Sequence, residues 1–485
     1  MIIINEIIII HRIIMHTPRF IDREQEIKSL QHLLESPTFE LTVLFGRRRI
    51  GKTMLARHVA QSCNAIYYLA QTESNLDLFY DECAFRFPEI NDVKKDYESI
   101  FKFLKDKVDL VIIDEFPNMI KENDAILSKF NSIIENNFYK QLSRLKLVLC
   151  GSSIFLMKSK VLDSSQPLYG RTTSILEIKP MPFFSLREFF PTKSFVELVE
   201  IFGFAGGAPY YLDKIEPEQS FWDWLEIEVS DPNSFFIQEM TILFEMEFTN
   251  ASLYKNVTRA IATGKTRMSE IANAAKISTT TLPSYLQTLM HTGFITREMP
   301  ITDKRNEAKN GRYFLNDNFM KFWFKFIYPR LSALSIGIYD IQFIRDNYST
   351  YLGAIFEDLI KQIMIKHNGE MWHFSNIGKY WGRYNKKVTG KVQSVEIELD
   401  ILAYDDASEN AYIGECKWSE NVNPKEILAP IMEYAMHVTF NGKPAKKVYT
   451  YLIFAKSFTE KLDTFEENHI QCFDIRDLER LCWNL

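Results

Sequence analysis

The sequence of 485 residues predicts an α/β protein in which helices cover both faces of a parallel sheet. The first observation is a set of apolar, β-rich runs between residues 39 and 182: ELTVLF, AIYYLA, VDLVIIDEF, LKLVLCGS and SILEIKPM. Helical patterns separate these runs, and near-continuous apolar strands joined by helices are typical of a parallel sheet buried on both sides. A second region of mixed helices and strands begins near Tyr351, so we expect more than one domain.

Changes of pattern along the chain divide it into five segments. They are an N-terminal extension (1–18), an α/β core (19–182), a helical subdomain (183–248), a segment of helices, two short strands and an aromatic-rich helix (249–345), and a C-terminal α/β domain (346–485). The extension MIIINEIIIIHRIIM is too short to span a bilayer, and polar residues interrupt it. We interpret it as a start codon placed too early, with Met15 as the true start; a short added strand is the alternative.

Composition argues against a membrane protein and against a globally basic one. No other apolar run is long enough to cross a bilayer, so we expect no membrane partner. The net charge of −6 provides no overall attraction to nucleic acid, so such binding would require a local basic patch. The six cysteines form no C-x-x-C pair and no histidines stand at zinc-ligand spacing, which predicts reduced thiols and a cytoplasmic location.

A phosphate-binding loop is predicted at residues 46–53, GRRRIGKT, which fit the pattern G-x-x-x-x-G-K-[ST]. A strand precedes it and the helical pattern TMLARHVAQ follows, so backbone N–H groups can surround a phosphate at a helix start. We expect Lys52 to reach the β- and γ-phosphates of ATP and the Thr53 hydroxyl to ligate Mg²⁺. The predicted nucleotide-binding residues are Gly46, Arg47, Arg48, Arg49, Ile50, Gly51, Lys52 and Thr53. The three arginines either face a partner domain or are solvated.

Two acids end the strand DLVIIDEF. Asp114 is expected to hold Mg²⁺, and Glu115 is expected to orient or deprotonate the attacking water. The alternative is an acidic strand end at a surface turn, but the Lys52 loop in the same domain favours the catalytic interpretation.

Two further positions are candidates for sensing or stabilising the γ-phosphate. Ser153 follows the apolar strand LKLVLCGS and either contacts the γ-phosphate or caps a helix. Arg171, in PLYGRTTSILEI, is either an arginine finger supplied in cis or by a neighbouring subunit, or a member of a structural ion pair.

The order of these motifs resembles that of prokaryotic ATPases of the AAA+/STAND type, the archaeal-type ATPase family. The resemblance covers about residues 19–480 and rests on PRFIDREQEIKSL, GRRRIGKT, LVIIDEF, LCGSS, PLYGRTT and GGAPYYL. It implies a P-loop NTPase sheet of five strands, with the sensor strand beside the phosphate-loop strand, a helical lid, and a switch-like role. It also implies that Pro209 touches the nucleotide and that RFIDREQEI lies near the adenine. The residues alone predict a rigid turn at Pro209, and a helix capped by Asp22 with Gln25 completing a capping box.

A winged helix is predicted from RMSEIANAAKISTTTLPSYLQTLMHTGFI. SEIANAAK forms the first helix, TTTLPSYLQTLMHTG the second, and FITREMP with GRYFLND the wing. Pro283 must lie in the first turn, because it would break a helix interior. The second helix carries no Lys or Arg, which favours a packing joint over a DNA reader, although Thr280, Ser284 and Gln287 leave base contacts open.

The C-terminal domain offers a second chemistry. Asp400 in EIELDILAY, Glu415 and Lys417 in AYIGECKW, and Glu357 in the helix GAIFEDLIKQIM resemble the PD-(D/E)XK arrangement of restriction-endonuclease-like folds. Asp400 and Glu415 would bind Mg²⁺, Glu357 would complete the metal site, and Lys417 would position the attacking water or neutralise charge on the phosphate. The alternative for E-x-K is an ordinary charge pair on an exposed strand.

A basic segment, KYWGRYNKKVTGK at residues 379–391, lies between these elements. Its five cations and the aromatics Tyr380, Trp381 and Tyr384 suit a nucleic-acid backbone with stacked bases; a solvated hairpin is the alternative. We therefore expect an ATPase that uses ATP and Mg²⁺, with nucleic acid bound and cleaved by the C-terminal domain. A nucleotide-switched regulator without cleavage, and an ATPase that remodels a protein, are the alternatives, and a protein partner or a homo-oligomer is compatible with each.

Overall fold

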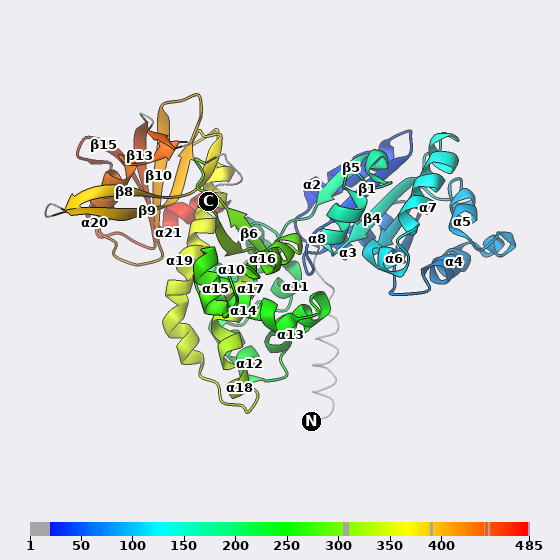
Figure 1. The fold of residues 1–485 in the computed structure, drawn as a ribbon, viewed down its shortest axis with the longest axis horizontal. Coiled ribbons are helices and arrows are strands. Elements are labelled where there is room, and N and C mark those ends of the chain that lie inside the picture. Colours follow the sequence, from blue (N-terminus) through cyan, green and yellow to red (C-terminus); the bar gives the residue numbers. More distant parts are fainter. Residues whose placement is uncertain (1–19, 304–309, 389–390, 441, 445–446, 484–485) are drawn as a thin grey trace. The chain divides into compact units, whose positions relative to one another are not determined.

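The computed structural model describes residues 20–303, 310–388, 391–440, 442–444 and 447–483 (Figure 1). The predictions for the N-terminal extension lie outside these ranges. Contacts divide the chain into two compact units. The first unit contains the described residues up to Met181, with Gly207–Lys214 and His291–Gly293, and the second contains the rest. No helix in the described ranges is both long enough and apolar enough to cross a membrane.

The first unit is built on a parallel sheet of five strands in the order β2-β3-β4-β1-β5 (Figure 1). This confirms the predicted fold class and the five predicted strands, and the strand before Ser152 lies directly beside the phosphate-loop strand. The strands are β1 (Glu40–Phe45), β2 (Ala65–Leu69), β3 (Leu110–Asp114), β4 (Lys146–Gly151) and β5 (Ser174–Glu177).

Helices cover both faces of this sheet, because alternate side chains of each strand point to opposite sides. Leu44 of β1 packs with Leu30 and Leu55 on one side, and Val43 packs with Phe101 and Phe130 on the other. The first side carries α2 (Glu24–Glu35) and α3 (Lys52–Gln61), and the second carries α4 (Asn75–Arg86), α5 (Tyr97–Leu104), α6 (Phe116–Glu122) and α7 (Ile126–Ile133). Shorter helical turns are η1 (Pro88–Asp92), η2 (Ile134–Tyr139), α8 (Ile154–Leu156), η3 (Met157–Val161), η4 (Tyr169–Arg171) and α11 (Pro209–Leu212).

The predicted capping box at the start of α2 is wrong. The helix begins at Glu24, its N-cap is Arg23 with φ 83°, and no side chain caps it. Asp22 also has a positive φ of 61°, and its carboxylate accepts from the Arg23 N–H at 2.8 Å. The backbone turns here through left-handed conformations, so Asp22 cannot occupy the capping position.

The second unit begins with helices and a two-stranded hairpin. The helix pair expected over residues 269–293 and the hairpin that follows it are present, and Pro283 lies in the first turn of α16, as predicted. The elements are η5 (Phe183–Ser185), α9 (Leu186–Phe189), α10 (Phe195–Ala205), α12 (Phe221–Ser230), α13 (Phe235–Glu247), α14 (Ala251–Ala262), α15 (Met268–Ala275), α16 (Leu282–His291), β6 (Ile295–Glu298) and β7 (Arg312–Leu315).

The prediction of one aromatic-rich helix at the end of the segment 249–345 is wrong. The segment forms α17 (Asn318–Phe322), a π-helical turn η6 (Trp323–Ile327), a 3-10 turn η7 (Tyr328–Arg330) and α18 (Leu331–Leu334). Pro329 has no backbone N–H to donate and cannot continue the α-helical pattern. The aromatic side chains nevertheless form core, as expected, since Phe319, Trp323 and Phe324 are fully buried.

The C-terminal part of the second unit is a mixed sheet of six strands in the order β14-β15-β13-β10-β9-β8. The long helix α19 (Ile341–Lys366) contacts β9 and β10 (Figure 1). The other elements are β8 (Asn376–Val388), β9 (Lys391–Tyr404), β10 (Asn410–Lys417), α20 (Pro424–Ala435), β11 (Thr439–Phe440), β12 (Lys443–Pro444), β13 (Val448–Ala455), β14 (Thr464–Phe465), β15 (Asn468–Phe473) and α21 (Ile475–Trp483). This is the second α/β region that the sequence predicts.

Replacing Phe101 by alanine should destabilise the first unit by about 3–5 kcal/mol, because it leaves a cavity beneath the sheet. The Phe101 ring is fully buried, with ring centroids 5.4 Å from Phe130 and 5.6 Å from Phe79. Calorimetry would measure the lowered melting temperature. Phe85, whose side chain is 90% exposed, provides the control, and an equal effect of Phe85→Ala would contradict this packing.

Candidate functional site

The predicted phosphate loop connects β1 to α3 and follows an unusual backbone path. Arg49 and Gly51 have φ values of 71° and 89°. A Cβ atom on Gly46 would lie 2.4 Å from the Ile178 carbonyl oxygen, so no larger residue fits there. The loop is therefore held tightly against the end of β5 while its backbone turns into the start of α3.

Lys52 is buried inside this loop. Its ammonium donates to the Arg47 carbonyl oxygen at 2.7 Å. Burial lowers the pKa of Lys52, and the nearby carboxylates of Glu115 and Asp114 oppose that shift. The positive charge of Lys52 is therefore held inside the loop, where a phosphate bound by the loop would meet it.

Asp114, at the end of β3, is fully buried and joins the loop to the sheet. Its Oδ2 accepts from the Thr53 hydroxyl at 2.7 Å and from the Tyr67 hydroxyl at 2.8 Å. Its Oδ1 accepts from the Glu115 N–H at 2.9 Å. The structure thus brings together the two oxygen donors that the sequence assigns to Mg²⁺, and hydroxyl and carboxylate oxygens are the ligand types that Mg²⁺ prefers. Sequence reasoning missed Tyr67.

Glu115 lies beside this pair in a left-handed conformation, with φ 51°, immediately before α6. Its carboxylate accepts from the Ser152 hydroxyl at 2.8 Å, which fixes its orientation at the end of β4. The next residue, Ser153, is the N-cap of α8 and accepts from the Leu156 N–H at 3.4 Å. The capping alternative for Ser153 is therefore the one seen in the structure.

Arg171 is engaged within its own unit. Its guanidinium contacts the Glu135 carboxylate at 2.9 Å and donates to the Asn131 amide oxygen at 3.0 Å. This arrangement favours the structural ion pair over the arginine finger.

Arg23 contacts the phosphate loop through its side chain, and the sequence did not predict this role. One of its terminal nitrogens donates to the Ile50 carbonyl at 3.0 Å and to the Lys179 carbonyl at 2.8 Å, and the other contacts Glu26 at 2.9 Å. The side chain is buried. Ile50 and Lys179 are far from Arg23 in the sequence, and no local pattern predicts these contacts. Only the position of Arg23 in the motif RFIDREQEI indicated that it lies near the nucleotide.

Pro209 lies against the phosphate loop from the other side. Its Cγ is 3.6 Å from the position that a Cβ on Gly51 would occupy. The next residue, Tyr210, donates its N–H to the Arg49 carbonyl at 3.4 Å, and the Arg49 guanidinium lies 4.1 Å from the Tyr210 ring centroid. The segment expected to touch the nucleotide therefore contacts the loop that would hold it.

The second predicted site lies in the C-terminal sheet. Lys417 contacts the Glu415 carboxylate at 2.6 Å, and Lys379 forms an ion pair with Glu357. Asp400 accepts from the Cys416 N–H at 2.9 Å. The β8–β9 register shifts between Gly378 and Tyr380, opposite the stretch of β9 that carries Asp400, and such bulges redirect side chains.

These carboxyl groups influence one another. Burial raises the pKa of Glu357 to about 7 and that of Asp400 to about 6, and the neighbouring negative charges add to both shifts. Burial also raises the pKa of Glu415. No group of three or more His, Cys, Asp and Glu residues in the described part of the chain is arranged to hold a metal ion. Lysines engage Glu357 and Glu415 in this arrangement, and the metal-binding role of Glu357, Asp400 and Glu415 stays a prediction.

The predicted stacking surface of the basic segment is wrong for two of its aromatics. Tyr380 is buried in the core of the C-terminal sheet, and Trp381 is buried with its indole N–H donating to the Asn310 carbonyl at 2.8 Å. Tyr384 stacks on His437 with ring centroids 3.8 Å apart. Strand alternation places these rings against protein on both faces of β8, and the side chains of residues 388–391 lie outside the described part of the structure.

Comparison with known proteins places this geometry in a family. Residues 20–215 match an ATPase domain predominantly from Archaea, and residues 323–427 match archaea bacterial proteins of unknown function. An uncharacterized protein of Methanocaldococcus jannaschii is 42% identical over 404 residues, which cover 83% of this chain and 88% of that protein. The chain belongs to the archaeal-type ATPase family. The predicted nucleotide-binding ATPase domain is thereby confirmed, and the protein is an ATP hydrolase.

Solved structures resemble parts of this ATPase at low sequence identity. A Walker-type ATPase of Pyrococcus abyssi is 21% identical with a TM-score of 0.49, over 63% of this chain and 96% of that one. The ORC2 protein of Aeropyrum pernix, in its ADPNP-ADP complexes, is 13% identical with a TM-score of 0.44, over 66% of this chain and 95% of that one.

Replacing Arg23 by methionine should lower the melting temperature and weaken ATP binding, although Arg23 is not expected to touch a phosphate. The substitution leaves the Ile50 and Lys179 carbonyls without their donor, at a cost of about 1.5–3 kcal/mol for a charged hydrogen bond. Calorimetry and nucleotide titration provide the two readouts. Lys28, which is exposed on the same helix, supplies the control variant Lys28→Met, which should change neither.

Proposed function

We propose that this ATPase is a nucleotide-controlled switch acting in the cytoplasm, with ATP and Mg²⁺ bound at the phosphate loop and nucleic acid at the C-terminal domain. The observation that carries the proposal is the buried Lys52 ammonium beside the hydrogen-bonded pair of Thr53 and Asp114. In this proposal Lys52 binds the β- and γ-phosphates, and Thr53 and Asp114 hold Mg²⁺, which neutralises phosphate charge when it is bound.

The remaining residues of the site have separate roles in this proposal. Ser152 orients Glu115 by hydrogen bonding, so that its carboxylate can position the attacking water. Pro209 responds to the phosphate loop because it lies against Gly51, and it carries that response to the chain beyond α11. The Glu135 ion pair supports a structural role for Arg171 within one subunit.

Two substitutions separate binding from hydrolysis. Lys52→Ala should weaken ATP binding by roughly 10- to 100-fold, because it removes a charged hydrogen bond worth about 1.5–3 kcal/mol. Glu115→Gln should retain binding and slow hydrolysis by roughly 10²- to 10⁴-fold. Nucleotide titration and phosphate release measure the two effects.

The control is Lys107→Ala, which removes an exposed lysine paired with Glu89 and should leave both readouts unchanged. Unimpaired ATP binding by the Lys52 variant would contradict the assignment of the loop.

For the C-terminal domain we propose cleavage of nucleic acid at the site of Asp400, Glu415 and Lys417. The support is the association of buried carboxyl groups with raised pKa values and a lysine, which is typical of functional sites. No group of three or more potential metal ligands is found among the described residues, so the dependence of cleavage on Mg²⁺ is part of what the assay tests.

Cleavage should depend on Asp400 and Lys417. With Mg²⁺ present, Asp400→Asn and Lys417→Ala should each reduce nicking of plasmid or RNA at least about 100-fold while nucleic-acid binding persists. Gel analysis of the products measures nicking. Lys425→Ala, which removes an exposed lysine paired with Glu460, is the control and should nick normally.

Other outcomes support the alternatives. Salt-sensitive binding without nicking would indicate a nucleotide-switched regulator. ATP hydrolysis stimulated by a protein and not by nucleic acid would indicate an ATPase that remodels a protein partner or a second copy of the chain.

A further inference from the structure

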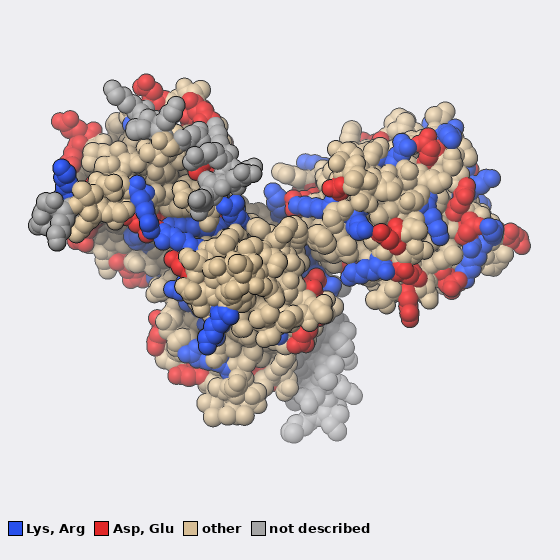
Figure 2. Space-filling view, viewed as in Figure 1, with Lys and Arg blue, Asp and Glu red and all other residues tan. Residues whose placement is uncertain are grey.

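A pocket of about 1060 Å³ in the second unit adjoins the hairpin β6–β7 and the strands β8 and β9. Among the described residues that line it, arginines outnumber carboxylates by four to two. Figure 2 shows Lys and Arg side chains gathered on the same unit near the C-terminal strands. The charged residues that line the pocket are Arg267, Arg297, Arg312, Arg383, Asp303 and Glu396.

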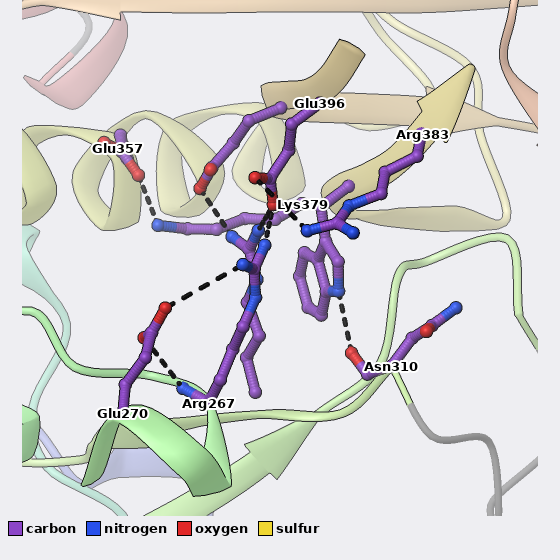
Figure 3. Close-up of polar contacts among 10 residues, drawn as sticks. Arg267, Glu270, Asn310, Glu357, Lys379, Arg383 and Glu396 are labelled. Atoms are coloured by element: carbon purple, nitrogen blue, oxygen red, sulfur yellow. Dashed lines mark hydrogen bonds and ion pairs between the residues drawn. The ribbon is translucent and has the colours of Figure 1, made fainter. Parts of the chain in front are cut away.

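Glu396 lies among three of these arginines (Figure 3). Its carboxylate forms an ion pair with Arg267, contacts Arg312 at 3.1 Å and approaches Arg383 to 4.0 Å. Guanidinium groups bind carboxylate and phosphate oxygens with the same forked geometry. Glu396 therefore occupies a position in which a phosphate group would find three guanidinium partners.

Arg312 has donor capacity that the described residues do not use. It is buried, and its Nε has no hydrogen-bond partner in the described part of the chain. One of its terminal nitrogens contacts Glu398 at 2.9 Å, and its guanidinium lies 4.8 Å from the Trp381 ring centroid. A buried N–H without a hydrogen-bond partner destabilises the folded protein. A ligand with an acceptor oxygen near Arg312 would therefore gain a hydrogen bond.

The pocket lies on the same strands as the carboxylate site. In the β8–β9 pairing Arg383 is opposite Glu396 and Trp381 is opposite Glu398, and opposed residues share one face of a sheet. Asp400 follows Glu396 by four residues along β9, a distance of about 13 Å. A strand of nucleic acid held at the arginines would therefore extend past Asp400 within a few nucleotides.

We propose that this arginine pocket binds backbone phosphates of nucleic acid and that Glu396 is an internal competitor for the same position. The proposal rests on the proposed nucleic-acid function of the C-terminal domain. A phosphate that enters the pocket displaces the Glu396 carboxylate from Arg267 and Arg312, and Arg312 keeps its contact with Glu398 throughout. Without nucleic acid, Glu396 therefore occupies the arginine pocket, and a nucleic-acid phosphate must displace it.

The test is equilibrium binding of labelled single-stranded and duplex oligonucleotides to the full chain, with EDTA present so that no cleavage occurs. Glu396→Gln should tighten binding about three- to tenfold, because it removes the competing charge. Arg383→Gln should weaken binding and reduce the slope of log affinity against log salt by about one. Arg383 has a side chain that is 63% exposed, so its loss should not disturb folding.

The matched controls are Arg345→Gln and Glu226→Gln, the two ends of one remote surface ion pair in the same unit. They report the effect of changing net charge alone. If Glu396→Gln tightens binding no more than Glu226→Gln, or if Arg383→Gln leaves affinity and salt slope unchanged, the proposal is overturned. If both shifts are found here and no nicking occurs in the separate assay with Mg²⁺, the proposed cleavage is rejected and the arginine pocket is retained.

Discussion

The hydrogen bond between Thr53 and Asp114 is the contact on which the first unit depends. It connects the first turn of α3 to the end of β3, although β4 lies between β3 and β1 in the sheet. Tyr67 donates to the same carboxylate oxygen, and Asp114 also receives the Glu115 N–H, so the aspartate is held from three sides. Because the Asp114 carboxylate is fully buried, it would be costly to leave it unsatisfied, and the loop, the strand ends and the candidate base keep one arrangement.

Local pattern in the sequence predicted the elements that carry this arrangement. The apolar runs gave all five strands of the first sheet, since a strand buried on both faces leaves an unbroken apolar signature. The glycines and Lys52 predicted the phosphate loop, because few residue types can adopt its backbone conformation. In the C-terminal part, periodicity predicted the strands β9 and β10 and the stretch of α19 that carries Glu357.

Contacts between distant parts of the chain could not be predicted in this way. Arg23 binds a carbonyl of the phosphate loop and another after β5, and neither partner is near it in sequence. The basic segment near Trp381 looked like an exposed binding surface because its composition is polar, yet the ring is buried. Composition gives the charge of a segment, but only packing decides which side chains reach solvent. For the same reason the arginine pocket could not be predicted from the sequence, since its four arginines come from four separate stretches of chain.

The junction between Met181 and Gly207 has a mechanical consequence. The Met181 N–H donates to the Gly207 carbonyl at 2.7 Å, and a side chain on Gly207 would collide with the Met181 carbonyl. At this contact the chain leaves the first unit after Met181 and re-enters it at Gly207, so the segment Pro182–Gly206 has adjoining ends. Gly207 lies two residues before Pro209, so this backbone contact also helps to fix where Pro209 meets the phosphate loop.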